Sequence, residues 1–106
     1  MEMAKYILSI LRTQLMVVWS WGFNSPIALE KGLRFRVQGF KFRGVVEVLY
    51  NEGQDLFDIF FIKRNKMVES INGVYFDQLV EVIDDYVEKT TNYKEMVEAE
   101  YTIKAS

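Results

Sequence analysis

Residues 1–21 show a helical repeat of apolar side chains. These side chains recur every three or four residues and form one stripe: Ala4, Ile7, Leu8, Leu11, Leu15 and Val18. This spacing is typical of an amphipathic helix whose stripe packs in a core. Turn-forming residues follow at Gly22 and at 24–26, so the helix is predicted to end near Trp21.

From Leu33 onward the pattern changes to a period of two. Apolar and polar residues alternate over 33–37, 42–50 and 56–62, and again near 67–71. Alternation of this kind predicts β-strands. Because turn-like segments separate the runs, we expect an antiparallel β-meander of three to four strands.

The first turn of this meander is predicted at Gly39 and Phe40. Glycine at the first central position suits a two-residue type II′ turn, which would place Val37 opposite Phe42 on the core face. A single bent strand is the alternative interpretation. Apolar residues occur on both faces of the meander, so the two helices that flank it could cover one face each.

A second amphipathic helix is predicted after Asn72 and Gly73. Its apolar stripe has helical spacing and consists of Leu79, Val82, Ile83 and Tyr86. Further along, Val97, Ala99, Tyr101 and Ile103 alternate with polar residues, which predicts a C-terminal strand, although 93–100 would also fit one or two helical turns. The order helix, three to four strands, helix, strand predicts an α+β fold, and the length suits a single domain over 1–106.

Composition argues against most enzyme classes. The chain has no cysteine and no histidine, which removes disulfides, thiolate nucleophiles, the commonest general base and the commonest transition-metal ligand. Its glycines never take the spacing of a phosphate-binding loop. We therefore expect no catalytic residues, no cofactor and no metal ion. The lack of cysteine also makes the cytoplasm the expected location.

The apolar N-terminal segment does not predict a membrane span. Its longest unbroken apolar run, 15–19, is too short to cross a bilayer, and no small-residue cleavage site follows it. The helix nevertheless carries more apolar surface than one stripe needs.

That spare surface predicts an interface with a protein partner or with a second copy of the chain, as in a homodimer. The candidate interface residues lie off the main stripe or in the aromatic segment that ends the helix: Ile10, Met16, Val17, Trp19, Trp21 and Phe23. Aromatic side chains are enriched in interface cores. Packing of the helix end beneath the sheet is the alternative for Trp19 and Trp21.

A basic strand pair supports a second hypothesis, a nucleic-acid-binding accessory protein. Its candidate contacts are Arg34, Arg36, Phe40, Lys41 and Arg43, a pattern in which guanidinium groups could hold phosphates and an aromatic ring could stack on a base. The net charge of −2 and the pI of about 5.2 argue against this hypothesis. Strand alternation, which places arginines on a solvated face, explains the pattern more simply.

Overall fold

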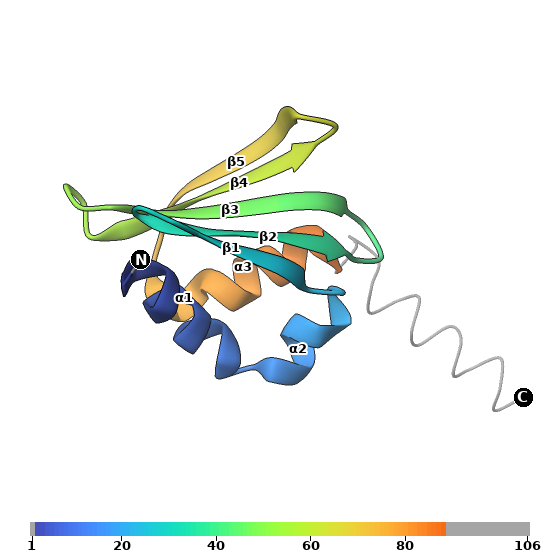
Figure 1. Ribbon diagram of the computed structural model, residues 1–106, viewed down its shortest axis with the longest axis horizontal. Helices are drawn as coiled ribbons and strands as arrows, with labels where there is room; N and C mark the ends of the chain where they lie inside the picture. The colour runs from blue at the N-terminus through green and yellow to red at the C-terminus, as the bar shows by residue number, and fades with distance from the viewer. Residues whose placement is uncertain (1, 89–106) are drawn as a thin grey trace, which may run out of the picture.

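The computed structural model describes residues 2–88. Helices pack on one antiparallel sheet, which confirms the α+β class (Figure 1). The elements are, in order, α1 (Glu2–Arg12), α2 (Leu15–Ser20), β1 (Asn24–Leu29), β2 (Gly32–Gln38), β3 (Arg43–Asn51), β4 (Leu56–Lys63), β5 (Lys66–Val74), the 3₁₀ turn η1 (Phe76–Gln78) and α3 (Leu79–Val87). The predicted C-terminal strand lies outside the described residues.

The five strands form one sheet in the order β1-β2-β3-β4-β5, and every neighbouring pair is antiparallel. The predicted meander is confirmed in β2 to β5, whereas β1 falls in a segment that the sequence assigned to a turn. Turn residues obscured this strand because it is an irregular edge. Its register shifts between Asn24 and Ile27, and Ser25 has a φ of 55°. An edge strand also tolerates Pro26, which lacks the N–H that a central strand needs.

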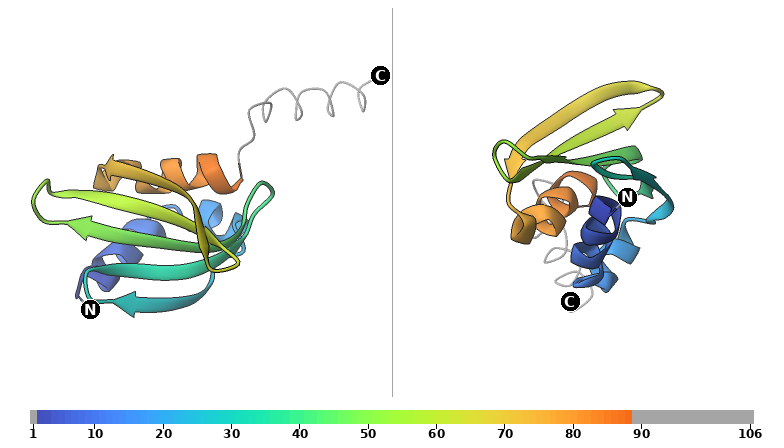
Figure 2. Two further views of the ribbon diagram at one scale, coloured as in Figure 1. Left: turned by 90° about the horizontal axis from the view of Figure 1, so that it is seen from above. Right: turned by 60° about the vertical axis from the view of Figure 1, so that its left-hand side comes forward.

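All three helices lie on the same face of the sheet (Figures 1 and 2). Between the two layers, Phe35, Val46 and Phe61 form a directly paired row across β2, β3 and β4, and each is completely buried. The expectation that the helices cover one face each is therefore wrong. The helices pack on the face whose alternating positions carry no charge on β2 and β3, and none on β4 before Lys63 at its exposed end, because burying an unpaired charge is costly.

The β2–β3 turn differs from the prediction by one residue in each strand. Val37 pairs with Gly44 and not with Phe42, and the Gly39 N–H donates to the Phe42 carbonyl at 3.0 Å, so the turn is centred on 40–41. A shift of this kind changes the register by two, and side-chain direction repeats every two residues. The predicted core face therefore survives an incorrect turn.

This β2–β3 turn also closes the C-terminal end of α3. The Val87 carbonyl accepts the backbone N–H groups of Lys41 and Phe42 at 2.8 and 3.2 Å. A Cβ placed on Gly39 would lie 2.2 Å from Val87 Cγ1 and 2.5 Å from its carbonyl oxygen. Glycine is thus needed here for the close approach to the helix, and the bonds satisfy a carbonyl that the helix leaves free.

The predicted N-terminal helix is two helices, α1 and α2. Hydrogen bonds from the N–H groups of Thr13 and Gln14 reach back three residues, to the carbonyls of Ile10 and Leu11 at 3.1 and 3.2 Å, which tightens the chain at the end of α1. The change of direction removes Leu15 from the stripe, and this residue is 42% exposed. The remaining stripe positions in α1 and α2 are buried or partly buried as predicted.

The α3 stripe is rotated slightly from its predicted position. Its fully packed residues are Leu79, Val80, Ile83 and Val87. Val82 and Tyr86 contact the core from the side and are only partly buried. Helical spacing identified the element, but its exact buried face depends on where α1 and β4 meet it.

Candidate functional site

The sheet face opposite the helices is left uncovered by residues 2–88 (Figure 2). Residues paired directly across antiparallel strands share a face, so the registers identify its members. We define the open sheet face as Ile27 and Leu29 of β1, Arg34 and Arg36 of β2, Arg43, Val45, Glu47 and Leu49 of β3, Leu56, Asp58, Phe60 and Ile62 of β4, and Met67 and Ser70 of β5. A sheet face in contact with water ordinarily carries polar residues at these positions, so this apolar content needs an explanation.

Two rows of paired residues cross the open sheet face. One row is Arg36, Val45, Ile62 and Met67, and the next is Arg34, Glu47, Phe60 and Ser70. The apolar members on β3 and β4 are half-buried by their neighbours alone. An apolar middle therefore lies beside the arginines of β2.

Charges of both signs occur on the open sheet face. Arg34 Nε lies 3.6 Å from Glu47 Oε2, and Asp58 Oδ1 accepts a backbone N–H bond at 3.1 Å. Arg36 and Arg43 are exposed and make no ion pair within the described part of the chain. Unpaired positive charge thus lies on the β2 side of the face, while Asp58 places negative charge on β4.

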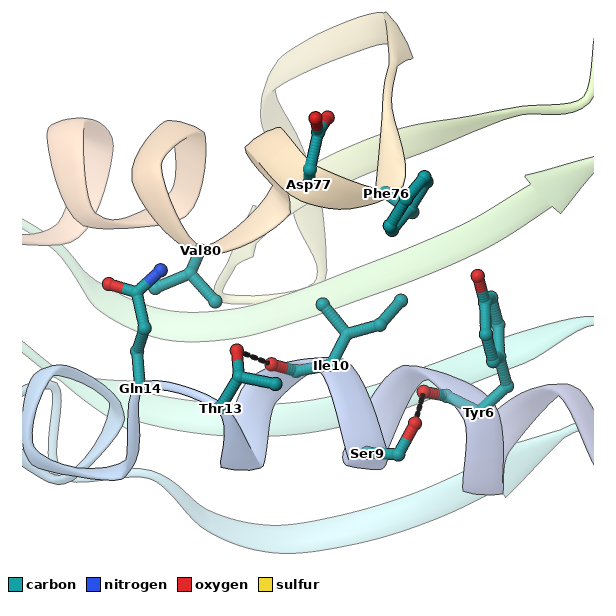
Figure 3. Close-up of a pocket in the computed structure, with 8 residues that line it drawn as sticks. All are labelled: Tyr6, Ser9, Ile10, Thr13, Gln14, Phe76, Asp77 and Val80. Atoms are coloured by element: carbon teal, nitrogen blue, oxygen red, sulfur yellow. Dashed lines mark hydrogen bonds between the residues drawn. The ribbon is translucent and has the colours of Figure 1, made fainter.

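A groove runs along the opposite, helical side of the molecule, between α1 and the η1–α3 segment (Figure 3). We call it the helical groove. It has a volume of about 310 Å³ and is lined by Tyr6, Ser9, Ile10, Thr13, Gln14, Phe76, Asp77 and Val80. Figure 3 shows the rings of Tyr6 and Phe76 at one end, Ile10 in the middle, and Val80 beside Gln14 at the other end.

The α1 wall of the helical groove is less polar than its composition suggests. The hydroxyls of Ser9 and Thr13 each donate to a backbone carbonyl of α1 at 2.6 Å, as the dashed lines in Figure 3 show. Both hydroxyl protons are therefore engaged in hydrogen bonds within α1. Asp77 is the only charged residue among those that line the groove.

Trp21 lies in the core, as the alternative interpretation of the helix end expected. Its side chain is completely buried, and its Nε1 donates to Asp84 Oδ1 at 2.9 Å. The end of α2 turns toward the sheet, so the indole packs in the core while the hydrogen bond satisfies its N–H.

The structure divides the other predicted interface residues into two groups. Ile10, Val17 and Phe23 are half-buried against the core, and the ring of Phe23 lies 4.7 Å from that of Phe35. Met16 and Trp19, on α2, are 77% and 64% exposed. Only these two project fully from the helical layer.

The predicted basic contacts do not form one surface. Arg34, Arg36 and Arg43 belong to the open sheet face, and Phe40 projects from the β2–β3 turn with 70% exposure. Lys41 points toward the helices: its Nζ donates to the Asp85 carbonyl at 2.8 Å and lies 6.0 Å from the centre of the Tyr86 ring. A cation there complements the negative end of the α3 dipole.

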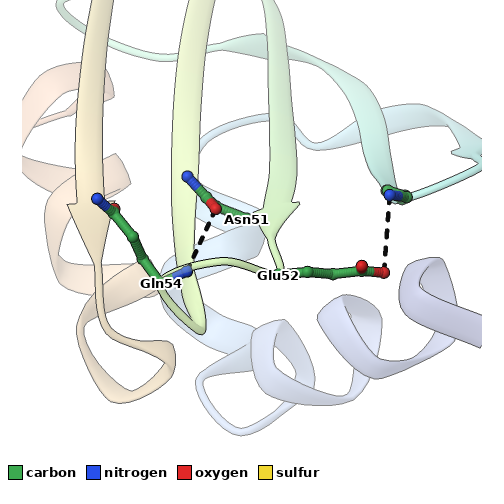
Figure 4. Close-up of polar contacts among 4 residues, drawn as sticks. Asn51, Glu52 and Gln54 are labelled. Atoms are coloured by element: carbon green, nitrogen blue, oxygen red, sulfur yellow. Dashed lines mark hydrogen bonds and ion pairs between the residues drawn. The ribbon is translucent and has the colours of Figure 1, made fainter.

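The β3–β4 turn is a second polar region, and its contacts are local (Figure 4). Asn51 Oδ1 accepts the Gln54 N–H at 3.3 Å, and Glu52 lies 3.6 Å from Lys31 Nζ. The hydrogen bond between the Tyr50 hydroxyl and Asp55 raises the pKa of Tyr50. These contacts hold the turn itself and join it to Lys31 between β1 and β2, so they are structural.

Comparison with known proteins provides no family for the chain. No family model, no curated protein and no solved structure matches it. Within residues 2–88, no helix is long and apolar enough to cross a membrane, and no group of acidic side chains is placed to hold a metal ion. The two surfaces must therefore be interpreted from their own chemistry.

Sequence reasoning identified the open sheet face only in part and missed the helical groove. The apolar residues on the second face were visible in the alternation, but not that they would stay uncovered. For the groove, the available signal was that Tyr6 and Ile10 lie off the α1 stripe. Its other wall, Phe76 with Val80, comes from a segment about seventy residues later and needed the fold.

Proposed function

We propose that the protein is a non-enzymatic interaction module and that two copies associate through the open sheet face. The observation that carries the proposal is the composition of this face, an apolar middle with unpaired positive charge on β2 and a carboxylate on β4. A second copy supplies the complementary charges in the same arrangement. Isologous contacts of this kind are the commonest route to a dimer.

Symmetry restricts how two such faces can meet. A two-fold axis across the strands would stack β2 on β2 and bring the arginines of the two copies together. An axis along the strands, through β3, instead places β2 of one copy over β4 of the other. Arg34 then lies one row away from Asp58 of the partner, and Arg36 lies over Ile62. Glu47 lies near this axis, and its charge is already compensated by Arg34. Two sheets packed in this way lie roughly 10 Å apart with their strands nearly aligned.

Sedimentation equilibrium from low micromolar to near-millimolar concentration tests the proposal. We expect a species of twice the 12.5 kDa chain mass at the upper concentrations. Ile62→Glu, in the apolar middle, should give a monomer with an unchanged circular dichroism spectrum, because a buried unpaired carboxylate is costly. Met16→Glu, on the far side, is the matched control and should leave the dimer intact.

Two results would contradict this assignment. A single 12.5 kDa species at every concentration would exclude the dimer. Dissociation by Met16→Glu with no effect of Ile62→Glu would move the interface to the helical side. Arg36→Glu adds a third measurement: it should weaken association because it would place a carboxylate over Ile62 in the apolar middle of the other copy, whereas an interface elsewhere would not change.

The nucleic-acid hypothesis is supported by the exposed, unpaired guanidinium groups of Arg36 and Arg43. Glu47 and Asp58 on the same face, and the orientation of Lys41 toward α3, oppose it. Titration of labelled mixed-sequence RNA and DNA should show no affinity beyond the non-specific range, about 10⁻⁴ to 10⁻⁶ M at physiological salt. Tighter binding that Arg36→Glu with Arg43→Glu abolishes would favour this hypothesis over the dimer.

A further inference from the structure

We infer that the helical groove binds a cationic amphipathic helix of a protein partner. This surface is on the opposite side from the open sheet face, so the inference goes beyond the proposed dimer. Three features support the inference: the shape of the groove, the hydrogen bonding of its backbone groups and the charge along its α3 rim.

The shape and lining of the groove suit apolar side chains presented by one face of a helix. A space of about 310 Å³ accommodates several side chains but not a whole element. Apolar side chains lie along its length, from the rings of Tyr6 and Phe76 through Ile10 to Val80 (Figure 3). The hydroxyl protons of Ser9 and Thr13 are committed to α1 carbonyls. The α1 wall therefore favours apolar contacts over specific hydrogen bonds.

The walls of the groove select a helix over an extended peptide. Strand addition needs an exposed sheet edge with free N–H and C=O groups, but these walls are α1 and the η1–α3 segment, whose backbone groups are largely bonded within the helices. A ligand that satisfies its own backbone hydrogen bonds loses nothing in such a site. A helix does so, and it presents anchoring side chains at intervals of three and four residues along its axis.

The charge of the partner follows from the α3 rim. Asp77 lines the groove, and its carboxylate stands on the outer side of η1, away from α1 (Figure 3). Glu81 follows in the first turn of α3. Asp84 lies further along α3, and its bond to Trp21 places its side chain next to the end of α2. Asp77 and Glu81 are exposed and make no ion pair within residues 2–88. Lysine or arginine residues flanking the apolar face of the partner would complement them.

The test uses two synthetic peptides of equal length, one of leucine and lysine and one of leucine and glutamate, both with amphipathic helical spacing. Nuclear magnetic resonance titration of the full chain should show that the lysine peptide binds. The shifted resonances should belong to α1, η1 and α3. The glutamate peptide should bind at least about tenfold more weakly, because it meets like charge along the rim.

Charge-matched variants separate the rim from general attraction to an acidic protein. Asp77→Asn with Glu81→Gln should weaken binding of the lysine peptide about tenfold, as expected for the loss of two exposed ion pairs. Glu52→Gln with Glu69→Gln removes the same charge from the β3–β4 turn and from β5, and should change the affinity by no more than about threefold. Phe76→Ala, at an exposed site, should also weaken binding, because it removes one wall of the groove.

Three outcomes would overturn the inference. These are equal weakening by both double variants, equal binding of the two peptides, or shifts confined to the open sheet face. Deletion of residues 89–106 tests another occupant. If this deletion shifts the resonances of groove residues in the absence of peptide, the occupant is the chain's own C-terminal segment. None of these readouts depends on whether the protein forms the proposed dimer, because Ile62→Glu can be titrated in the same way.

Discussion

The indole Nε1 of Trp21 donates a hydrogen bond to Asp84 Oδ1 at 2.9 Å, and this bond joins the end of α2 to α3. Trp21 is completely buried, so its N–H has no access to water once Asp84 is removed. We expect Asp84→Ala to lower the free energy of unfolding by about 1–3 kcal/mol, because a buried donor is left unsatisfied.

Asp84→Asn should retain most of this stability, since the amide oxygen still accepts the bond. Glu81→Ala, on the exposed surface of the same helix, should stay within about 0.5 kcal/mol of the wild type. Urea-induced unfolding measures all three variants. Equal stability of Asp84→Ala and Glu81→Ala would mean that the bond does not contribute.

Because α1 and α2 are separate helices, alanine substitutions at two leucines of the predicted stripe should differ in their effect on stability. Leu11 is 2% exposed and Leu15 is 42% exposed. Leu11→Ala should therefore cost about 2–5 kcal/mol, whereas Leu15→Ala should cost less than about 1 kcal/mol. Thermal and urea unfolding compare the pair. Equal losses would restore the continuous helix over 1–21.

The contact between Gly39 and Val87 predicts that a single methyl group loosens the cap of α3. Gly39→Ala should lower the free energy of unfolding by about 1–3 kcal/mol, because its Cβ would overlap the Val87 carbonyl and side chain. Gly53→Ala is the control, since a Cβ there meets nothing nearer than Asn51 Oδ1 at 3.4 Å. Amide hydrogen exchange in the last turn of α3 should increase in Gly39→Ala alone.

The raised pKa of Tyr86 leads us to expect a loss of stability at alkaline pH. Burial raises the pKa of this tyrosine, and the charge of Glu69 raises it further, so the fold favours the neutral phenol. The contribution is complete below the unfolded value, which is about 10, and is lost as the pH rises through the higher folded value. Tyr86→Phe should therefore lose less stability than the wild type as the pH rises above about 10. Parallel stability curves for the two proteins would contradict this assignment.

Sequence reasoning was most successful where a pattern is local and repeated. The alternation in β2 and β3 placed Val37 and Phe42 on the core face, and both are buried. This conclusion withstood an incorrect turn because a register shift of two preserves side-chain direction. It failed at β1, where an irregular edge strand contains the residues of a turn. Edge strands need fewer backbone partners, so their sequences are less constrained.

The amino-acid sequence by itself determined the α+β class, the strands β2 to β5, the helical character of α1 and α3, and the lack of histidine and cysteine chemistry. These properties depend on residue identity and on periods of two and 3.6, which neighbouring residues express without the rest of the chain. The tertiary structure alone decided that Trp21 is buried against Asp84, that every helix packs on one face of the sheet, and that Tyr6 and Phe76 meet across a groove. Each of these depends on contacts between segments far apart in the sequence, and their geometry follows from how whole elements pack together.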